Sequence, residues 1–322
     1  PELPATELED ADVELTIPAA VDVEGPNDRF VCFVVDPEVS GLTFMEATQV
    51  NPGNDAIVHH VLVYSTSSSQ VDEMAGEDGY YDCFGGIGVN SLSLISAWAP
   101  GVQPARFPTE APGVLQAGEK LVINVHYHPT GVGTEVDDST SIDIKWHEGL
   151  PEYVSQLNLI GNFSTGYSGL MPGPNDTDDV PEFRIPAGEE SHTEMMRWTK
   201  PASLPDLRVW MVGAHMHYVG VDMAIAVQRG ADSEQEDFCA LQTPNYDFNW
   251  QRGYVYDLDF EDTPVLETGD TLYMQCEYNN SFSNPYIADA LADQGLDEPI
   301  DVHLGEETLD EMCLGVFGIA AP

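Results

Sequence analysis

Six of the nine histidines fall in three tight clusters, and clustered imidazoles are typical of metal sites. The clusters are His59-His60, His126-Tyr127-His128 and His215-Met216-His217. Residues i and i+2 of a β-strand point to the same face, so His215 and His217 can offer two imidazoles to one ion. The same holds for His126 and His128. His59 and His60 are adjacent, so both can bind one metal only where their strand ends or bulges.

Imidazole ligands alone suit zinc, copper, iron or nickel. The sequence has no H-E-x-x-H helix motif of a zinc protease. A thioether ligand would favour copper, because soft sulfur suits Cu(I). Met274 and Met312 lie close to cysteines late in the chain, although a methionine is more often a core residue. His147, His192 and His303 are isolated, and we assign them no metal role.

Five cysteines are present, so two disulfides leave one residue over, and spacing alone does not fix the pairing. They are Cys32, Cys83, Cys239, Cys276 and Cys313. No C-x-x-C motif occurs, which disfavours a thioredoxin motif or a zinc ribbon. Two readings stay open: buried free thiols in a cytosolic protein, or an exported protein with two long-range disulfides.

Short runs rich in Val, Ile, Tyr, Phe and Thr recur between turn residues and predict β-strands. The strands are expected at 30–35, 58–64, 120–127, 141–146, 207–212, 221–228 and 270–277. The one helix candidate is 287–292. The fold class predicted is all-β, with sandwich or barrel architecture. The length of 322 residues suits two domains, and Gly149 and Pro151 mark the best boundary: domains 1–150 and 151–322, with an acidic N-terminal segment at 1–12.

The charge balance excludes some partners. Ten Lys and Arg residues stand against 56 Asp and Glu, a formal net charge of −46. Such a surface repels phosphate backbones, so we expect no nucleic-acid binding, and it disfavours docking on anionic membranes. No apolar run is long enough for a transmembrane helix. The chain begins Pro1-Glu2-Leu3 without Met, which we interpret as a mature or trimmed form.

Five motifs occur in an order that resembles one enzyme family. They are Ile57 to Leu62, Ala97-Trp98-Ala99-Pro100, Val125 to His128, Ala214 to His217 and Asp310-Glu311-Met312-Cys313. Together they resemble the copper type II, ascorbate-dependent monooxygenases, the family of peptidylglycine α-hydroxylating monooxygenase and dopamine β-monooxygenase. The resemblance runs from about Val13 to Ala320.

The resemblance implies two tandem antiparallel β-sandwich domains of jelly-roll type, each with one copper ion. One copper would take His59, His60 and His126, and the other His215, His217 and Met312. The resemblance thereby selects His126 over His128 and Met312 over Met274. It also implies Cys32–Cys83 and Cys276–Cys313 disulfides, and hence secretion to the periplasm or the extracellular space.

Some positions depart from the peptide-hydroxylating branch. The arginine that grips the peptide carboxylate there corresponds to Gly213, and Leu314 and Val316 replace polar residues after the Glu-Met-Cys motif. Peptide amidation is therefore not expected. Cys239 has no partner in the implied pairing. The aromatic segment 245–251 is more similar to the dopamine branch, and we expect it to pack beneath the second copper strand.

The function implied is hydroxylation of a C–H bond of a small organic substrate with O2 and an ascorbate-like reductant. His215, His217 and Met312 would hold the copper that reacts with O2, and the three-histidine copper would supply the second electron. One alternative is an exported protein that binds or stores copper without turnover. Another is an acidic β-sandwich adhesion module whose histidines bind no metal. The sequence identifies no particular substrate or oligomeric state.

Overall fold

The computed structural model describes residues 7–25, 27–84, 86–90, 93–162, 169–176, 180–248, 250–307 and 309–322. Half of the acidic segment 1–12 and residue 249 of the aromatic segment therefore lie outside the described residues. The chain forms two compact units. Unit 1 holds residues 1–158 and 319–322, and unit 2 holds residues 159–318. The passage from unit 1 to unit 2 lies within a strand (Val154–Asn162), beyond the turn where we placed the boundary.

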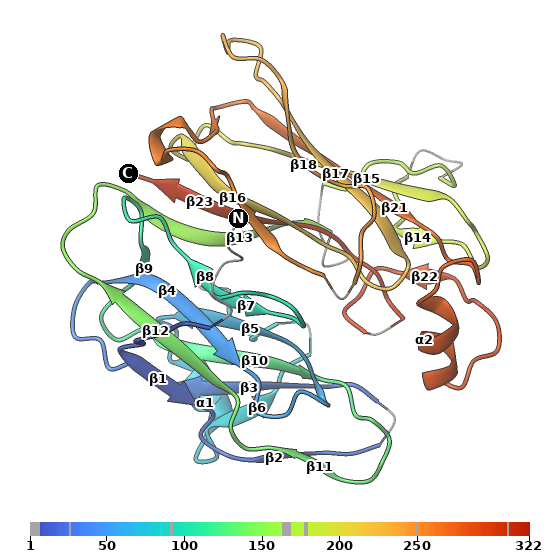
Figure 1. The fold of residues 1–322 in the computed structure, drawn as a ribbon, viewed down its shortest axis with the longest axis horizontal. Coiled ribbons are helices and arrows are strands. Elements are labelled where there is room, and N and C mark those ends of the chain that lie inside the picture. Colours follow the sequence, from blue (N-terminus) through green and yellow to red (C-terminus); the bar gives the residue numbers. More distant parts are fainter. Residues whose placement is uncertain are drawn as a thin grey trace. The chain divides into compact units, whose positions relative to one another are not determined.

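Strands dominate both units, which confirms the all-β prediction (Figure 1). Unit 1 contains β1 (Val13–Thr16), β2 (Val21–Val23), β3 (Arg29–Val35), β4 (Thr43–Asn51), β5 (Val58–Thr66), α1 (Gln70–Ala75), β6 (Tyr80–Asp82), β7 (Ser93–Trp98), β8 (Ala105–Arg106), β9 (Gly113–Leu115), β10 (Lys120–Tyr127), β11 (Glu135–Asp137), β12 (Ser141–His147) and most of β13 (Val154–Asn162). The expected strands at 30–35, 58–64, 120–127 and 141–146 are all present. The sequence missed α1, which has no side-chain cap.

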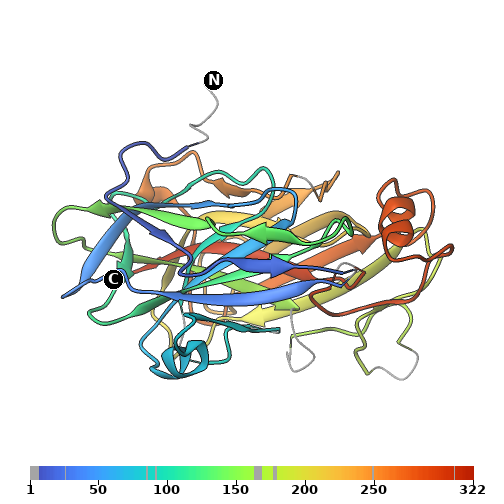
Figure 2. The ribbon, with the colours of Figure 1, turned by 90° about the horizontal axis from the view of Figure 1, so that it is seen from below.

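Unit 2 contains β14 (Arg184–Ile185), β15 (His192–Thr199), β16 (Leu207–His215), β17 (Gly220–Gln228), β18 (Phe238–Thr243), β19 (Gly253–Val255), η1 (Phe260–Asp262), β20 (Val265–Leu266), β21 (Thr271–Tyr278), α2 (Ile287–Asp293), β22 (Val302–His303) and most of β23 (Cys313–Ala321). The expected helix at 287–292 is α2, which lies near β22 at one end of unit 2 and buries Ile287, Ala290 and Leu291 (Figures 1 and 2). No helix in the described ranges is long and apolar enough to cross a membrane.

In unit 1, β10 lies between β5 and β3, and every residue after Lys120 is buried (Figure 1). A strand is buried on both faces only when each face is covered. One face carries Val122 and packs against a cluster that includes the Cys32–Cys83 disulfide and Val71 of α1. β4 and β12 pair elsewhere in this unit, and Thr48 of β4 donates a buried hydrogen bond to Ser96 of β7. This arrangement is consistent with a β-sandwich.

In unit 2, β17 and β21 form the centre of a four-stranded sheet in the order β15-β21-β17-β18. β16 pairs with β19, β20 and β23. The Cys276–Cys313 disulfide joins β21 to the start of β23, so the structure contains both implied bridges, and Cys239 is an exposed free thiol. Met274 is fully buried, as expected of a core methionine.

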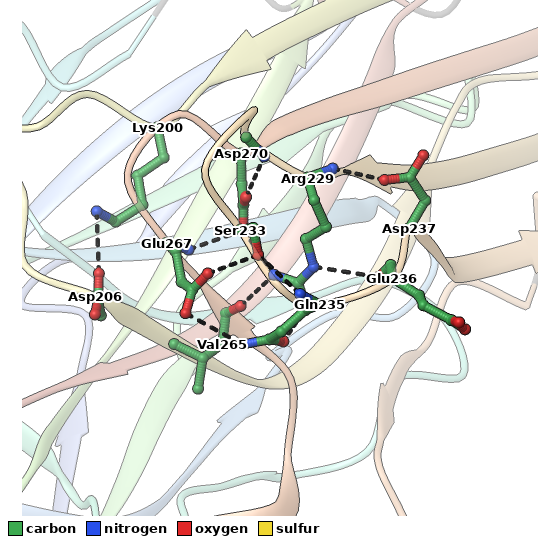
Figure 3. Close-up of polar contacts among 11 residues, drawn as sticks. Lys200, Asp206, Arg229, Ser233, Gln235, Glu236, Asp237, Val265, Glu267 and Asp270 are labelled. Carbon is green, nitrogen blue, oxygen red and sulfur yellow. Dashed lines mark hydrogen bonds and ion pairs between the residues drawn. The ribbon is translucent and has the colours of Figure 1, made fainter.

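A polar network closes one end of the β17–β21 pair (Figure 3). The buried Arg229 guanidinium lies 2.6 Å from Asp270 Oδ2, and the backbone N–H of Glu267 donates to the same carboxylate. Gln228 pairs with Thr271 at this end, whereas Gly220 pairs with Tyr278 at the other. The strands are eight or nine residues long, so at about 3.3 Å per residue the network is well over 20 Å from the opposite end, where His217 precedes β17. It is part of the scaffold.

Candidate metal centres

Three histidine rings of unit 1 converge through the same ring atom. His59 Nδ1 lies 3.2 Å from His126 Nδ1 and 3.3 Å from His60 Nδ1, and the His60 and His126 atoms are 3.3 Å apart. His126 is fully buried, and the other two rings are half-buried. Within the described residues this trio forms the one group of three or more His, Cys, Asp or Glu side chains whose ligand atoms come within 4.8 Å of one another.

A β-bulge makes this convergence possible. His126 of β10 pairs with His60 of β5, but the next residue, Tyr127, pairs with Val58, so His59 has no residue opposite it. An extra residue in one strand turns the following side chain relative to the pleat. His59 and His60 can therefore present their rings to the same point, although adjacent residues of a regular strand point apart.

The register also separates His126 from His128. The backbone N–H of His128 donates to Ile57 O at 2.8 Å, beyond the bulge, and its Nδ1 lies 2.6 Å from Asp28 Oδ1. The structure thus brings His126 into the cluster with His59 and His60 and turns His128 towards Asp28. Phe30 stacks on the His126 ring with centroids 4.1 Å apart and planes 12° from parallel, which fixes the orientation of that ring.

The trio has the geometry of a metal site. Three Nδ1 atoms in mutual contact cannot all be satisfied by N–H···N bonds, because at least two of them must carry the same group, and two hydrogens or two lone pairs would then face each other. A cation on the axis of a triangle with sides of 3.2–3.3 Å can lie about 2.0 Å from each nitrogen, the usual metal–imidazole distance. The residues present therefore fit a three-imidazole metal centre.

In unit 2, His215 and His217 lie side by side, with ring centroids 5.3 Å apart. His215 Nδ1 donates to Gln251 Oε1 at 2.5 Å, and His217 Nδ1 donates to the backbone oxygen of Asp310 at 2.9 Å. These bonds place the ring proton on Nδ1 and leave the Nε2 lone pair of each ring as the potential ligand. Burial lowers the pKa of His215, while the bond to Gln251 opposes that shift. Burial therefore favours the neutral imidazole, the form that binds metals.

Glu311 connects Met312 to the His215–His217 segment. Its Oε1 accepts hydrogen bonds from the backbone N–H groups of both His217, at 2.5 Å, and Met312, at 2.8 Å. Tyr278 also donates to Met312 O at 3.0 Å, and the Cys276–Cys313 disulfide holds the next residue. The structure thus brings the backbone of Met312 next to that of His217. Burial raises the pKa of the fully buried Glu311 to about 8, while its backbone hydrogen bonds oppose this shift.

The aromatic segment 245–251, which follows β18, contacts the backbone between His215 and His217. The Tyr246 hydroxyl donates to Met216 O at 2.6 Å and accepts from Met216 N at 3.0 Å, so one side chain fixes the residue between the two histidines. Burial raises the pKa of Tyr246 well above its usual value, which keeps the hydroxyl protonated as a donor. Phe248 packs on Tyr218, with ring centroids 4.3 Å apart.

Gly213 lies where the main chain of another strand comes close. It pairs with Gly253 of β19, and a Cβ atom at position 213 would lie 2.9 Å from the backbone oxygen of Arg252. Any side chain here would require β19 to shift. The backbone thus accounts for the absence of an arginine at this position.

The sequence did not identify Asp28 and Tyr278 as partners of the candidate ligand segments, because neither belongs to a recognisable spacing pattern. Asp28, for example, is one of 56 acidic residues and lies far along the chain from His126. Tyr246 and Gln251 lie in the segment 245–251, which was expected to pack beneath the second copper strand, but their individual hydrogen bonds were not predicted. Glu311 was part of a motif, and the motif did not reveal that its carboxylate accepts hydrogen bonds from two separate segments.

Comparison with known proteins identifies distant relatives. No family model matches the chain. It is 26% identical over 273 residues to human "Putative DBH-like monooxygenase protein 2", covering 81% of this chain and 46% of that protein. It is 23% identical over 273 residues to mouse "DBH-like monooxygenase protein 1", covering 82% of this chain and 39% of that protein. The chain is thus similar to DBH-like monooxygenases and spans less than half of their length.

Solved structures resemble the chain only weakly. The major capsid protein P2 of bacteriophage PM2 is 11% identical with a TM-score of 0.35, covering 96% of this chain and 97% of that one. The STIV MCP is 10% identical with a TM-score of 0.25, covering 88% of this chain and 97% of that one. At these scores the likeness carries no conclusion about function or fold.

Proposed function

We propose that this protein is a copper-dependent monooxygenase that hydroxylates a C–H bond of a small organic substrate, using O2 and an ascorbate-like reductant. The observation that carries the proposal is the convergence of the His59, His60 and His126 Nδ1 atoms to within 3.3 Å of one another. The named relatives, DBH-like monooxygenases, support the reaction class. The two disulfides support an exported protein, since such bonds persist in oxidising compartments.

The two groups of ligands would hold one copper ion each. His59, His60 and His126 form an all-nitrogen group, which suits both Cu(II) and Cu(I) and fits the role of electron donor. His215, His217 and Met312 form a group with a thioether, which favours Cu(I). Bound copper would supply the one-electron and dioxygen chemistry that no side chain provides. The second group is therefore assigned to the reaction with O2 and substrate.

The protein's own groups would hold these ligands in a fixed protonation state. The hydrogen bonds from His215 Nδ1 to Gln251 and from His217 Nδ1 to Asp310 O would hold the ring protons on Nδ1, so that Nε2 is the atom of each ring that binds the ion. The Glu311 carboxylate holds the backbones of His217 and Met312 together. These contacts would hold the two imidazoles and the Met312 backbone in place before a substrate arrives, which would reduce the reorganisation that binding needs.

The test is copper stoichiometry followed by turnover. Wild-type protein loaded with Cu(II) should bind two ions per chain, with the electron paramagnetic resonance signal of two uncoupled mononuclear sites. With ascorbate and O2 it should hydroxylate a member of a panel of small amines and aromatic compounds. Met312→Ala should abolish hydroxylation and leave the three-histidine copper bound. Met274→Ala, which truncates a buried methionine of the same unit, should retain turnover.

Each outcome decides between the candidate functions. Chains that bind two copper ions but consume no O2 with ascorbate across the panel would support the alternative of a copper-binding or copper-storage protein. Chains that bind no copper after chelator-free purification and Cu(II) titration would exclude both. Retained turnover in Met312→Ala would remove Met312 from the reacting site.

A further inference from the structure

A largely buried carboxylate lies behind the three-histidine cluster. Asp28 Oδ2 is 3.1 Å from His126 Nε2, the ring atom opposite the converging Nδ1, and Asp28 Oδ1 is 2.6 Å from His128 Nδ1. The Asp28 side chain is 7% exposed and that of His126 1% exposed, whereas His128 is 29% exposed. Asp28 thus connects a ring of the cluster to a histidine near the surface.

The His126 ring depends on Asp28 for its outer contact. Its Nε2 is buried and makes no well-aligned hydrogen bond in the described part of the chain. The Asp28 carboxylate at 3.1 Å is the acceptor nearest to an N–H at this atom. Phe30 fixes the plane of the ring by stacking, but stacking does not choose which nitrogen carries the proton. A carboxylate beside Nε2 does so: it favours the proton there and leaves Nδ1 as the ligand atom.

In unit 2 the Nδ1 atoms of His215 and His217 hydrogen-bond to uncharged groups. His215 Nδ1 donates to the neutral side-chain amide oxygen of Gln251, and His217 Nδ1 donates to the neutral backbone oxygen of Asp310. In each ring Nδ1 is the nitrogen that points away from the proposed metal. A carboxylate acceptor makes an imidazole more basic than a neutral acceptor does. A more basic imidazole stabilises the more highly charged metal ion, because the added electron density compensates charge.

We propose that Asp28 is a positioning residue that biases the three-histidine site towards Cu(II), and that His128 anchors the Asp28 carboxylate in place. The inference rests on the proposed function in one respect, since it takes copper as the ion of this site. It offers a reason why the two sites would prefer different oxidation states of copper. His126 has a charged carboxylate behind its ring, whereas His215 and His217 bond through Nδ1 to neutral oxygens.

The experiment measures Cu(II) and Cu(I) affinities of the first site alone. The full chain carries His215→Ala and His217→Ala, so that copper reports only from the trio in unit 1. Into this background Asp28→Asn is introduced, which keeps an acceptor oxygen and removes the charge. Cu(II) titration, Cu(I) competition with a chelator, and spectroscopic potentiometry are then compared with the parent.

Asp28→Asn should weaken Cu(II) binding about 10- to 100-fold, the usual cost of losing an outer-shell partner. Cu(I) binding should weaken less, so that the ratio of the two affinities shifts about tenfold, equivalent to about 59 mV for one electron. Asp28→Glu, which restores the charge, should recover part of the shift. Asp36→Asn is the matched control, because it makes the same charge change in unit 1 at the exposed pair with Lys120, and it should leave the ratio unchanged.

Two results would overturn the inference alone: copper bound with an unchanged affinity ratio in Asp28→Asn, or an equal shift in Asp36→Asn. A parent chain that binds no copper would instead overturn the proposed function, and this inference with it. His128→Ala provides a second variant should Asp28→Asn fail to fold. It keeps the carboxylate without its anchor, and should shift the ratio in the same direction by about threefold; no shift there would contradict the anchoring role.

Discussion

The two histidine groups are built in different ways, although each draws on residues far apart in sequence. In unit 1 the candidate ligands lie on two paired strands, and the bulge at His59 directs the rings towards one point. In unit 2 His215 ends β16, His217 precedes β17 and Met312 precedes β23, so the candidate ligands lie where strands end. There a buried side chain, Glu311, ties the segments together.

This difference suits different tasks. Under the proposed function, ligands fixed by the register of paired strands would move little, which favours electron transfer, where small reorganisation is an advantage. Ligands at strand ends, held by hydrogen bonds to a few side chains, would be better placed to admit O2 and a substrate. The comparison therefore predicts that loss of a supporting residue can displace the ligands of the second group, whereas in the first group it changes the metal affinity and leaves the sheet register intact.

Removing the carboxylate of Glu311 should have the largest effect. In Glu311→Ala the backbone N–H groups of His217 and Met312 lose their acceptor inside the protein, at about 1–3 kcal/mol each. The free energy of unfolding should fall by about 4 kcal/mol, measured by denaturant titration of the chain. Copper binding should drop from two ions to one, with the three-histidine signal intact.

Glu311→Gln is the control for that substitution. It retains an acceptor oxygen of similar reach, so the loss of stability should be about half as large. If Glu311→Ala removed the unit 1 copper together with the unit 2 copper, the two groups would not be independently supported and the comparison would be wrong.

The sequence predicted the strands well because their alternation and turn residues are local signals. The predicted strand 120–127 coincides with β10, and the others differ at their ends by a few residues. The helix α1 was missed because it is short and lacks a side-chain cap. The condition set for His59 and His60, a bulge in their strand, is met in the structure.

The supporting residues could not be predicted, because their roles depend on tertiary contacts alone. Asp28 touches His126 only because β3 and β10 pair, and Gln251 reaches His215 only because its segment folds back beside β16. The choice of His126 over His128 came from the resemblance. Its physical reason, the pairing of His126 with His60, is a matter of register that spacing does not encode. That these side chains bind copper stays a prediction.

Replacing the hydrogen-bond acceptor of His215 tests whether a charged acceptor sets the preference of a site for Cu(II) over Cu(I). Gln251→Glu gives His215 Nδ1 a carboxylate acceptor and makes this site resemble the one behind His126. The second copper should then shift about tenfold towards Cu(II), measured as the ratio of Cu(II) to Cu(I) affinities in a chain carrying His59→Ala and His126→Ala. Gln251→Leu, which offers no acceptor, should weaken both oxidation states without this shift. A shift of equal size in both variants would show that packing, not charge, sets the preference.

The smallest effect is expected where a single hydroxyl supports the backbone between two ligands. Tyr246→Phe removes the donor to Met216 O and the acceptor for Met216 N without changing the shape of the ring. The free energy of unfolding should fall by about 1 kcal/mol, and copper affinity at the second group by less than tenfold, because His215 and His217 keep their own partners. Tyr286→Phe is the matched control: its hydroxyl donates to Asp247, the residue after Tyr246, and not to the backbone between the two histidines. It should leave copper affinity unchanged. An equal loss of affinity in both variants would mean that general loosening of this segment, and not the bonds to Met216, governs the site.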